Sequence, residues 1–385
     1  MHYYIFASKD SYITEDSPGH IVLYPDSTDK NYGGDEILEL KKGFVNSYST
    51  ASYNVSRILT EFDYTTGLIP QFQVNGGLIP SESAKYYLRY YEVEGQQELD
   101  KTYSLSSHVI GASGDLNKWV EGSGKHFDNP KTKTGVTWTD YDSGSAWYTG
   151  AGSAYLSGSR TPGGGVWLDS ATLGTNLDAS QSFVNQSGDI EMDVTDIVNK
   201  HLDGTFYNTG ILTKFSGSYE DDGTPLHLKF FSRNTHTIYT PKLEVRWDDS
   251  THSPGTLTQL TMSGEIENHI FIKGLQPTYR ESEKVRFRMG CRKKYVQKTF
   301  TESALTSSFY VPHGSGSYSI VDVATNTPIV PFGAYTSMSC DSNSMYFDQW
   351  LNTFEPGRYY KVLFKLKYED GQEVIIDNDE EFKVI

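Results

Sequence analysis

The chain has 385 residues, of which 33 are basic and 49 are acidic, so its formal net charge at pH 7 is −16. This balance argues against nucleic acid or an anionic membrane as the general partner, because both reward Lys and Arg. Aromatic residues make up 14% of the chain, with 28 Tyr and 19 Phe, and such side chains favour the half-buried surfaces of β-strands.

The sequence shows neither an export signal nor a membrane-spanning helix. Residues 1–17 have no basic n-region and no apolar h-region of the kind that a secretory signal carries. No stretch reaches the roughly 18 apolar residues that a membrane helix needs. We therefore expect a protein that is made in a cytoplasm and carries no export signal of its own.

The chain has two cysteines, Cys291 and Cys340, and no CxxC pair. Neither a zinc site nor a disulfide framework is therefore indicated. Two buried free thiols are the favoured interpretation, and a single disulfide bridge stays open as the alternative.

Short runs of alternating apolar and polar residues recur along the chain, and Gly, Asn, Asp, Ser or Pro separates them. Many short strands with turn signals between them predict a sandwich or jelly roll rather than βαβ units. The clearest runs lie at residues 20–24, 36–40, 86–93, 226–231 and 242–247.

Helical signals are few and predict two short covers on a β-core. The first helix is expected over residues 193–202, where an Asp or Thr can cap its start and Gly204 can end it. The second is expected from Phe347 to Phe354, because apolar residues recur there at spacings of three and four until Pro356 stops the pattern.

A polar stretch at Asp248–Gly255 follows a terminal strand and marks the predicted domain boundary. We expect a jelly-roll-like sandwich at residues 1–248, a linker at 249–256 and a smaller sandwich at 257–385. Residues 138–187 are rich in Gly, Ser and Trp with little alternation, which predicts long inserted loops that serve function or are held by a partner.

Several short motifs follow one another in the first domain. They are Asp10-Ser11-Tyr12-Ile13, Asn31-Tyr32-Gly33, Ser56 to Asp63, Trp119-Val120-Glu121-Gly122, Gly135-Val136-Thr137-Trp138, Asp193 to Val198, Phe230 to Arg233 and Pro241 to Val245. In this order they resemble the DNRLRE-type β-sandwich family, which overlaps with a carbohydrate-binding module of polysaccharide-processing enzymes. The resemblance implies a jelly-roll-like sandwich and carries over no sugar site, because the shared residues read as structural.

The chemistry of the motif residues agrees with a structural interpretation. Arg57 and Asp63 flank a strand and are expected to hold loops through charge-assisted bonds. The apolar positions Phe62, Val194, Ile197 and Val245 are expected to face the core, and Trp119 and Trp138 are more often packed inside such a sandwich than stacked on a sugar. Asp10 and its acidic neighbours offer oxygen ligands to Ca²⁺, but their spacing is not diagnostic, so no cofactor is predicted.

The second domain resembles an immunoglobulin-like sandwich. Phe354 to Val362 matches the P-G-x-Y entry to a late strand, where a Tyr hydrogen-bonds back across the corner. Alternation over 361–368, a turn at Asp370-Gly371 and a return over 373–376 predict a hairpin, with a last strand at 381–384.

One basic stretch, Lys284 to Lys298, departs from the acidic trend, with seven basic residues and no acidic one. Alternation places Val285, Phe287 and Met289 inward. Two interpretations stay open: a solvated strand face, or an electrostatically steered docking strip for an acidic neighbouring subunit. Nucleic acid ranks third as a partner of the strip because the net charge of the chain opposes it. The residues of that strip would be Arg286, Arg288, Arg292, Lys293 and Lys294.

No linear motif of a catalytic site occurs: there is no HExxH, no G-x-S-x-G and no phosphate-binding loop. The sequence therefore predicts no enzyme. The best candidate for a partner or glycan surface is a set of aromatic residues on Gly/Ser-rich loops, with subunit packing favoured over sugar. These residues are Trp138, Tyr141, Trp147, Tyr148, Tyr155 and Trp167.

A sandwich module of a type usually found outside cells, without an export signal, fits a virion protein that is made in the host cytoplasm and released by lysis. The chain is also similar in style to the virion structural proteins of large tailed phages. We therefore expect a structural component of a bacteriophage particle, in the tail, baseplate or neck, that forms homo- or hetero-oligomers with other virion subunits. A capsid decoration protein and a glycan-binding module for host adsorption are the alternatives. A polysaccharide lyase or hydrolase on a β-scaffold is a further alternative that no motif supports.

Overall fold

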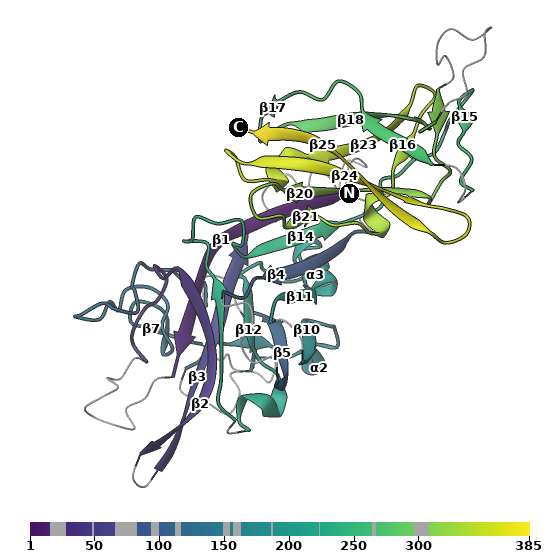
Figure 1. The fold of residues 1–385 in the computed structure, drawn as a ribbon. Helices are drawn as coiled ribbons and strands as arrows, with labels where there is room; N and C mark the ends of the chain where they lie inside the picture. The colour runs from purple at the N-terminus through teal and green to yellow at the C-terminus, as the bar shows by residue number, and fades with distance from the viewer. Residues whose placement is uncertain are drawn as a thin grey trace, which may run out of the picture. The chain divides into compact units, whose positions relative to one another are not determined.

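The computed structural model describes residues 1–15, 28–47, 50–65, 83–93, 100–111, 117–148, 155–156, 163–185, 188–222, 224–263, 267–295 and 308–385 (Figure 1). Strands make up 47% of the structure and helices 7%, and nearly all strand pairs are antiparallel, which confirms the all-β class. The chain divides into two compact units.

The larger unit comprises Ile5–Pro80 and Lys85–Glu244, and the smaller unit comprises Met1–Tyr4, Ser81–Ala84 and Val245–Ile385. The long segment of the smaller unit thus begins close to the boundary expected after residue 248. The smaller unit also holds the first residues of the chain: the Gln349 amide donates to the His2 carbonyl at 3.0 Å, and the Tyr4 hydroxyl donates to the Ile329 carbonyl. Contacts between residues so distant in sequence leave no local pattern from which they could be predicted.

Among the described residues, a ten-stranded sheet has the order β10-β5-β12-β3-β1-β14-β4-β11, and β2 pairs with both β3 and β13. Its strands are β1 (His2–Thr14), β2 (Ile37–Ser47), β3 (Thr50–Phe62), β4 (Lys85–Tyr90), β5 (Thr102–Val109), β10 (Asp178–Val184), β11 (Ile190–Asp193), β12 (Ile211–Phe215), β13 (Leu226–Phe231) and β14 (Lys242–Arg246). In the described part of the larger unit, four shorter strands lie apart from this sheet, namely β6 (Asp140–Asp142), β7 (Ser145–Ala146), β8 (Tyr155–Leu156) and β9 (Trp167–Leu168). The predicted strands at 36–40, 86–93, 226–231 and 242–247 are confirmed by β2, β4, β13 and β14, while the one at 20–24 lies outside the described residues.

Helices in the larger unit are short: α2 (Ser170–Leu173), α3 (Thr195–Leu202) and the 3₁₀ turn η1 (Gly217–Glu220). Helix α3 confirms the helix predicted over 193–202. The Asp193 carboxylate accepts from the Thr195 backbone N–H at 2.9 Å, and Ile197 and Val198 are buried on the inner face of the helix.

The described part of the smaller unit contains two larger sheets that are mainly antiparallel, a four-stranded sheet in the order β16-β18-β23-β22 and a five-stranded sheet in the order β17-β25-β24-β20-β21, and a two-stranded sheet of β15 and β19. The strands are β15 (Thr258–Gln259), β16 (Asn268–Ile272), β17 (Thr278–Tyr279), β18 (Lys284–Lys293), β19 (Phe309–Tyr310), β20 (Gly316–Asp322), β21 (Pro328–Val330), β22 (Ser339–Cys340), β23 (Met345–Trp350), β24 (Tyr359–Lys367) and β25 (Glu373–Val384). Strands β17 and β25 pair in parallel, as do β15 and β19. Aromatic rings join the two sheets: Tyr318 stacks on Phe347 at 3.9 Å, and Phe287 packs on Phe382 at 5.5 Å between ring centroids.

The second predicted helix is wrong. Residues 345–350 form strand β23, and only the 3₁₀ turn η3 (Leu351–Thr353) follows it; a further 3₁₀ turn, η2, spans Ala334–Thr336. Met345, Phe347 and Gln349 are buried while the residues between them are not, and β23 pairs along its length with β18. Apolar residues in a strand with alternating burial, followed by a buried turn, happen to recur at the three- and four-residue spacing that is typical of a helix.

The C-terminal hairpin is confirmed by β24 and β25, with Lys367 opposite Glu373 and a turn in which Gly371 has a φ of 86°. The strand predicted at 381–384 is the end of β25. The tyrosine bond expected at the start of β24 is present, because the Tyr360 hydroxyl donates to the Glu355 carbonyl at 3.0 Å. Cys291 and Cys340 are buried free thiols, as predicted, and burial raises the pKa of the Cys291 thiol to about 12.

Candidate functional site

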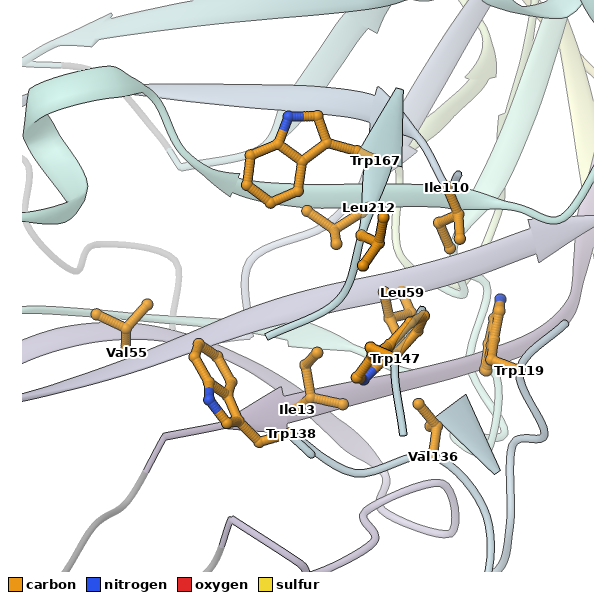
Figure 2. Packing of buried hydrophobic residues seen from close by; sticks show 11 residues of the cluster. Ile13, Val55, Leu59, Ile110, Trp119, Val136, Trp138, Trp147, Trp167 and Leu212 are labelled. Carbon is orange, nitrogen blue, oxygen red and sulfur yellow. The ribbon is translucent and has the colours of Figure 1, made fainter. Parts of the chain in front are cut away.

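The predicted aromatic surface is largely an interior. Trp138, Trp147 and Trp167 are buried in one apolar cluster with Trp119 (Figure 2). The cluster also holds Ile13, Val55, Leu59, Ile110, Val136, Val166 and Leu212. The packing favoured for Trp119 and Trp138 by their motifs is therefore confirmed. The candidate surface that included Trp138, Trp147 and Trp167 is corrected, because segments around β6, β7 and β9 fold these rings against the main sheet.

A buried cation lies between two of these rings. The Arg57 guanidinium is 5.1 Å from the ring centroids of both Trp138 and Trp167. It also donates to the Glu220 carboxylate at 2.9 and 3.0 Å, and the Lys214 ammonium donates to the same carboxylate at 3.1 Å. Burial opposes ionisation of Glu220, but Arg57 and Lys214 hold its pKa below the usual value.

Arg57 also donates to the carbonyl of Gly164, in the loop that precedes β9. Its predicted role in holding loops through charge-assisted bonds is confirmed. Asp63 lies exposed after β3, and its predicted role stays a prediction.

The predicted tyrosines lie closer to the surface. Tyr141 and Tyr155 are half-buried against the tryptophan cluster, and Tyr148 is exposed. The structure thus brings five of the six predicted residues together, but it does so around a core rather than around an open ligand surface.

The motif residues of the larger unit form an internal polar network. The Asp10 carboxylate accepts from the Ser232 hydroxyl at 3.0 Å and from the Arg233 backbone N–H at 2.7 Å. Glu121 in turn accepts from the Asp10 N–H at 2.9 Å and from the Arg233 guanidinium at 3.0 Å. Burial raises the pKa of Asp10 to about 7.

Asn31 connects the same region to the backbone. Its side-chain amide donates to the carbonyls of Glu121 and Val136 at 2.7 and 2.8 Å, and its oxygen accepts from the Gly124 N–H at 2.8 Å. A Cβ at Gly33 would lie 2.0 Å from the Glu121 carbonyl oxygen, which explains the glycine. The motif residues are therefore used to join loops to strands, and no group of three His, Cys, Asp or Glu arranged for a metal ion occurs within the described ranges.

The basic strip lies on β18 and finds acidic partners within its own unit. Arg286 forms a two-pronged ion pair with Asp348 at 2.8 and 2.9 Å, and Arg288 forms another with Asp341 at 2.8 and 3.1 Å. The Tyr346 ring lies 4.1 Å from the Arg286 guanidinium and 5.7 Å from that of Arg288. These contacts favour the interpretation of the basic strip as a solvated strand face over that of a docking strip.

The end of the strip is similar. Lys294 pairs with Glu267 at 2.6 Å, and Arg292 donates to the carbonyls of Lys293 and Lys294. Lys293 itself is half-buried. Docking of an acidic subunit here stays a prediction, and it would have to compete with these internal pairs.

A different surface feature, which the sequence did not suggest, is the loop 125–133. It places the Phe127 side chain in solvent with 92% of the residue exposed. The one aromatic contact of that ring within the described chain is an edge-on approach to His126, with centroids 5.0 Å apart. No periodicity marks this phenylalanine, and its only signal is an aromatic residue set among Lys, His, Asp, Asn and Pro.

The loop is held in place by hydrogen bonds at both ends. The His126 N–H donates to the Asp35 carboxylate at 3.0 Å, and the Asn31 N–H donates to the Thr132 carbonyl at 2.8 Å. Inside the loop, Asp128 accepts from the Lys125 N–H at 2.8 Å and from the Thr132 hydroxyl at 2.7 Å. Phe127 is therefore presented by a backbone that needs little ordering when a partner binds.

Comparison with other proteins gives no assignment. Models of known protein families do not match the chain, and no curated protein matches it either. The DNRLRE-type resemblance therefore stays a prediction. Within the described residues, no helix is long and apolar enough to span a membrane.

Proposed function

We propose that this chain is a structural component of a bacteriophage virion, in the tail, baseplate or neck, and that it acts by assembling with other virion subunits. The larger unit would be the jelly-roll-like sandwich of the DNRLRE type, and the smaller unit the immunoglobulin-like sandwich. The observation that carries the assembly role is the exposed Phe127 on its ordered loop.

An exposed aromatic side chain on a pre-ordered loop has the properties of an interface anchor. Aromatic residues dominate the energetics of protein interfaces, and burial of a phenylalanine side chain stabilises a complex by about 1.5–3 kcal/mol. The lysines around Phe127 are already balanced locally: Lys125 pairs with Glu36, and Lys131 and Lys133 pair with Asp29. A partner would therefore meet an aromatic anchor with a mixed-charge rim.

The burial of the tryptophans argues against the glycan-binding alternative. Its stacking platform required Trp138, Trp147 or Trp167 at the surface, and all three are buried.

The test is quantitative mass spectrometry of purified particles. We expect this chain at a fixed copy number per particle, and its absence from purified particles would end the proposal. Incorporation of a Phe127→Ser variant should fall sharply, whereas Tyr207→Ser, which changes another aromatic residue of the same unit at 69% exposure, should incorporate normally. If both variants are incorporated equally, Phe127 and its loop do not contribute to assembly.

A further inference from the structure

Three polar side chains meet on the face of the large sheet where β10, β5 and β12 run side by side (Figure 1). Ser106 and His108 are two residues apart on β5, so their side chains point to the same face. Asp178 on β10 lies directly opposite His108. The sheet register itself therefore brings these three residues together.

The distances are those of a nucleophile, a base and an orienting acid. The Ser106 Oγ lies 2.9 Å from His108 Nε2, and His108 Nδ1 lies 2.7 Å from Asp178 Oδ1. Burial opposes ionisation of Asp178, but its bond to His108 holds the carboxyl pKa below the usual value. Because a carboxylate only accepts, Nδ1 is the donor to Asp178, and in the neutral imidazole Nε2 is then free of a proton and accepts from the Ser106 hydroxyl.

The same three residues line a cleft of about 590 Å³, within the usual size range of small-molecule sites. Ser106 is only 5% exposed, whereas 42% of the Asp178 side chain is exposed, so the hydroxyl lies deepest. The Trp167 ring packs on the His108 ring at 5.4 Å and restricts its rotation. Lys214, which lies on β12 opposite Ser106, also lines the cleft, and its ammonium donates to the Glu220 carboxylate at 3.1 Å and to the Phe215 carbonyl at 2.8 Å.

We infer that Ser106, His108 and Asp178 form a catalytic triad that hydrolyses short-chain acyl esters of polyhydroxylated compounds. Ser106 Oγ attacks the acyl carbon while His108 takes the hydroxyl proton, and His108 then gives that proton to the departing alcohol oxygen as the ester C–O bond breaks. Water next attacks the acyl-enzyme while His108 takes a proton from it. His108 then returns this proton to Ser106 Oγ as the acyl–Oγ bond breaks, which releases the carboxylic acid and free Ser106.

The cleft lining supports this substrate class. Most of its groups are hydroxyl, amide or ionic, including Asn176, Ser180 and Ser216, so it suits a hydroxylated alcohol better than a long acyl chain. Sequence motifs could not reveal the triad, since a Ser-x-His pair on a strand has no linear signature and Asp178 lies 70 positions from His108.

The test uses the purified full-length chain with two probes, p-nitrophenyl acetate and a fluorophosphonate. We expect ester hydrolysis and a covalent phosphonyl adduct that peptide mapping assigns to Ser106. Ser106→Ala should abolish the adduct and lower the hydrolysis rate at least about 100-fold, and Asp178→Asn should also lower the rate strongly.

The control variant is Ser182→Ala, on the same strand as Asp178 but outside the triad and the cleft, which should leave both readouts unchanged. A polar contact that only stabilises the sheet would change the melting temperature without any adduct. Absence of an adduct on Ser106 in the folded wild-type chain, or equal rates for wild type and Ser106→Ala, would overturn the triad. Because adduct mapping uses the wild-type chain, it decides the matter even if a variant fails to fold.

Discussion

Two segments of the larger unit use aromatic residues in opposite ways. Around β6, β7 and β9, the rings of Trp138, Trp147 and Trp167 turn inward onto the main sheet. In the loop 125–133, Phe127 points into solvent. Both segments are poor in regular strand and rich in turn-forming residues, so composition alone does not distinguish them.

The difference comes from what lies beneath each segment. Arg57 provides a buried cation on which two indole rings pack, and the apolar residues of β1, β3 and β12 complete that cluster. The loop 125–133 instead lies against Asn31 and Asp35, which form hydrogen bonds with its backbone. These polar neighbours offer no apolar surface on which the Phe127 ring could pack. Burial of an aromatic side chain therefore depends on distant residues, not on the loop that carries it.

The largest expected difference between the two segments is the loss of stability when one aromatic side chain in each is truncated. Trp138→Ala removes a large ring from a packed core and should lower the free energy of unfolding by about 3–5 kcal/mol. Phe127→Ala removes a ring that packs on almost nothing and should change it by less than about 0.5 kcal/mol. Urea unfolding at neutral pH measures both. A large loss for Phe127→Ala would mean that the loop, too, is held by its aromatic side chain.

The second prediction concerns the cation beneath the tryptophans. Arg57→Met keeps most of the side-chain volume but leaves Glu220 with Lys214 as its main ionic partner in a buried site, so unfolding should become easier by about 3 kcal/mol. Indole fluorescence should report the change, since two rings lose their contact with the guanidinium. A variant with unchanged stability and emission would show that the rings pack without Arg57.

A third prediction uses pH to test the internal polar network around Asp10. The pKa of Asp10 is raised by burial to about 7 in the folded chain, against an unfolded value of about 3.9. A raised carboxyl pKa means that the folded state holds the proton more tightly, so this group's stabilising contribution is full below about pH 4 and is lost as pH rises towards 7.

The free energy of unfolding should therefore fall by about 1–3 kcal/mol between pH 4.5 and 7.5 relative to the Asp10→Asn variant. The variant lacks the titrating group, so the difference in pH slope isolates Asp10 even if the amide weakens the bonds from Ser232 and Arg233. Parallel slopes for the two proteins would show that the Ser232 and Arg233 donors keep Asp10 ionised throughout.

Sequence patterns predicted the features that local chemistry determines. Helix α3, the C-terminal hairpin and the Tyr360 bond each depend on residues close together in the chain, and each is confirmed. Strand β23 was mistaken for a helix because a buried strand followed by a buried turn has the same apolar spacing.

Features that join distant residues could not be predicted in this way. Arg57 and Glu220 are 163 positions apart, and the guanidinium of this pair lies 5.1 Å from the ring centroids of both Trp138 and Trp167. The exposure of Phe127 depends equally on residues far from it, such as Asp35, which lies 91 positions from His126. Periodicity carries no information about such pairs, so the surface that the sequence favoured is a core and the surface that it missed is the candidate interface.

The smallest expected effect concerns the basic strip of the smaller unit, where the pairing of charges can be compared with that of buried Arg57. The Arg286 side chain is 46% exposed, so water screens its two-pronged pair with Asp348. Arg286→Ala should therefore lower the free energy of unfolding by less than about 1 kcal/mol, and by less still in high salt.

If the strip instead docks an acidic subunit, the same variant should weaken a salt-sensitive self-association or complex, seen by light scattering, while stability hardly changes. Loss of several kcal/mol of stability would contradict both interpretations, because it would require the exposed pair to behave like the buried one.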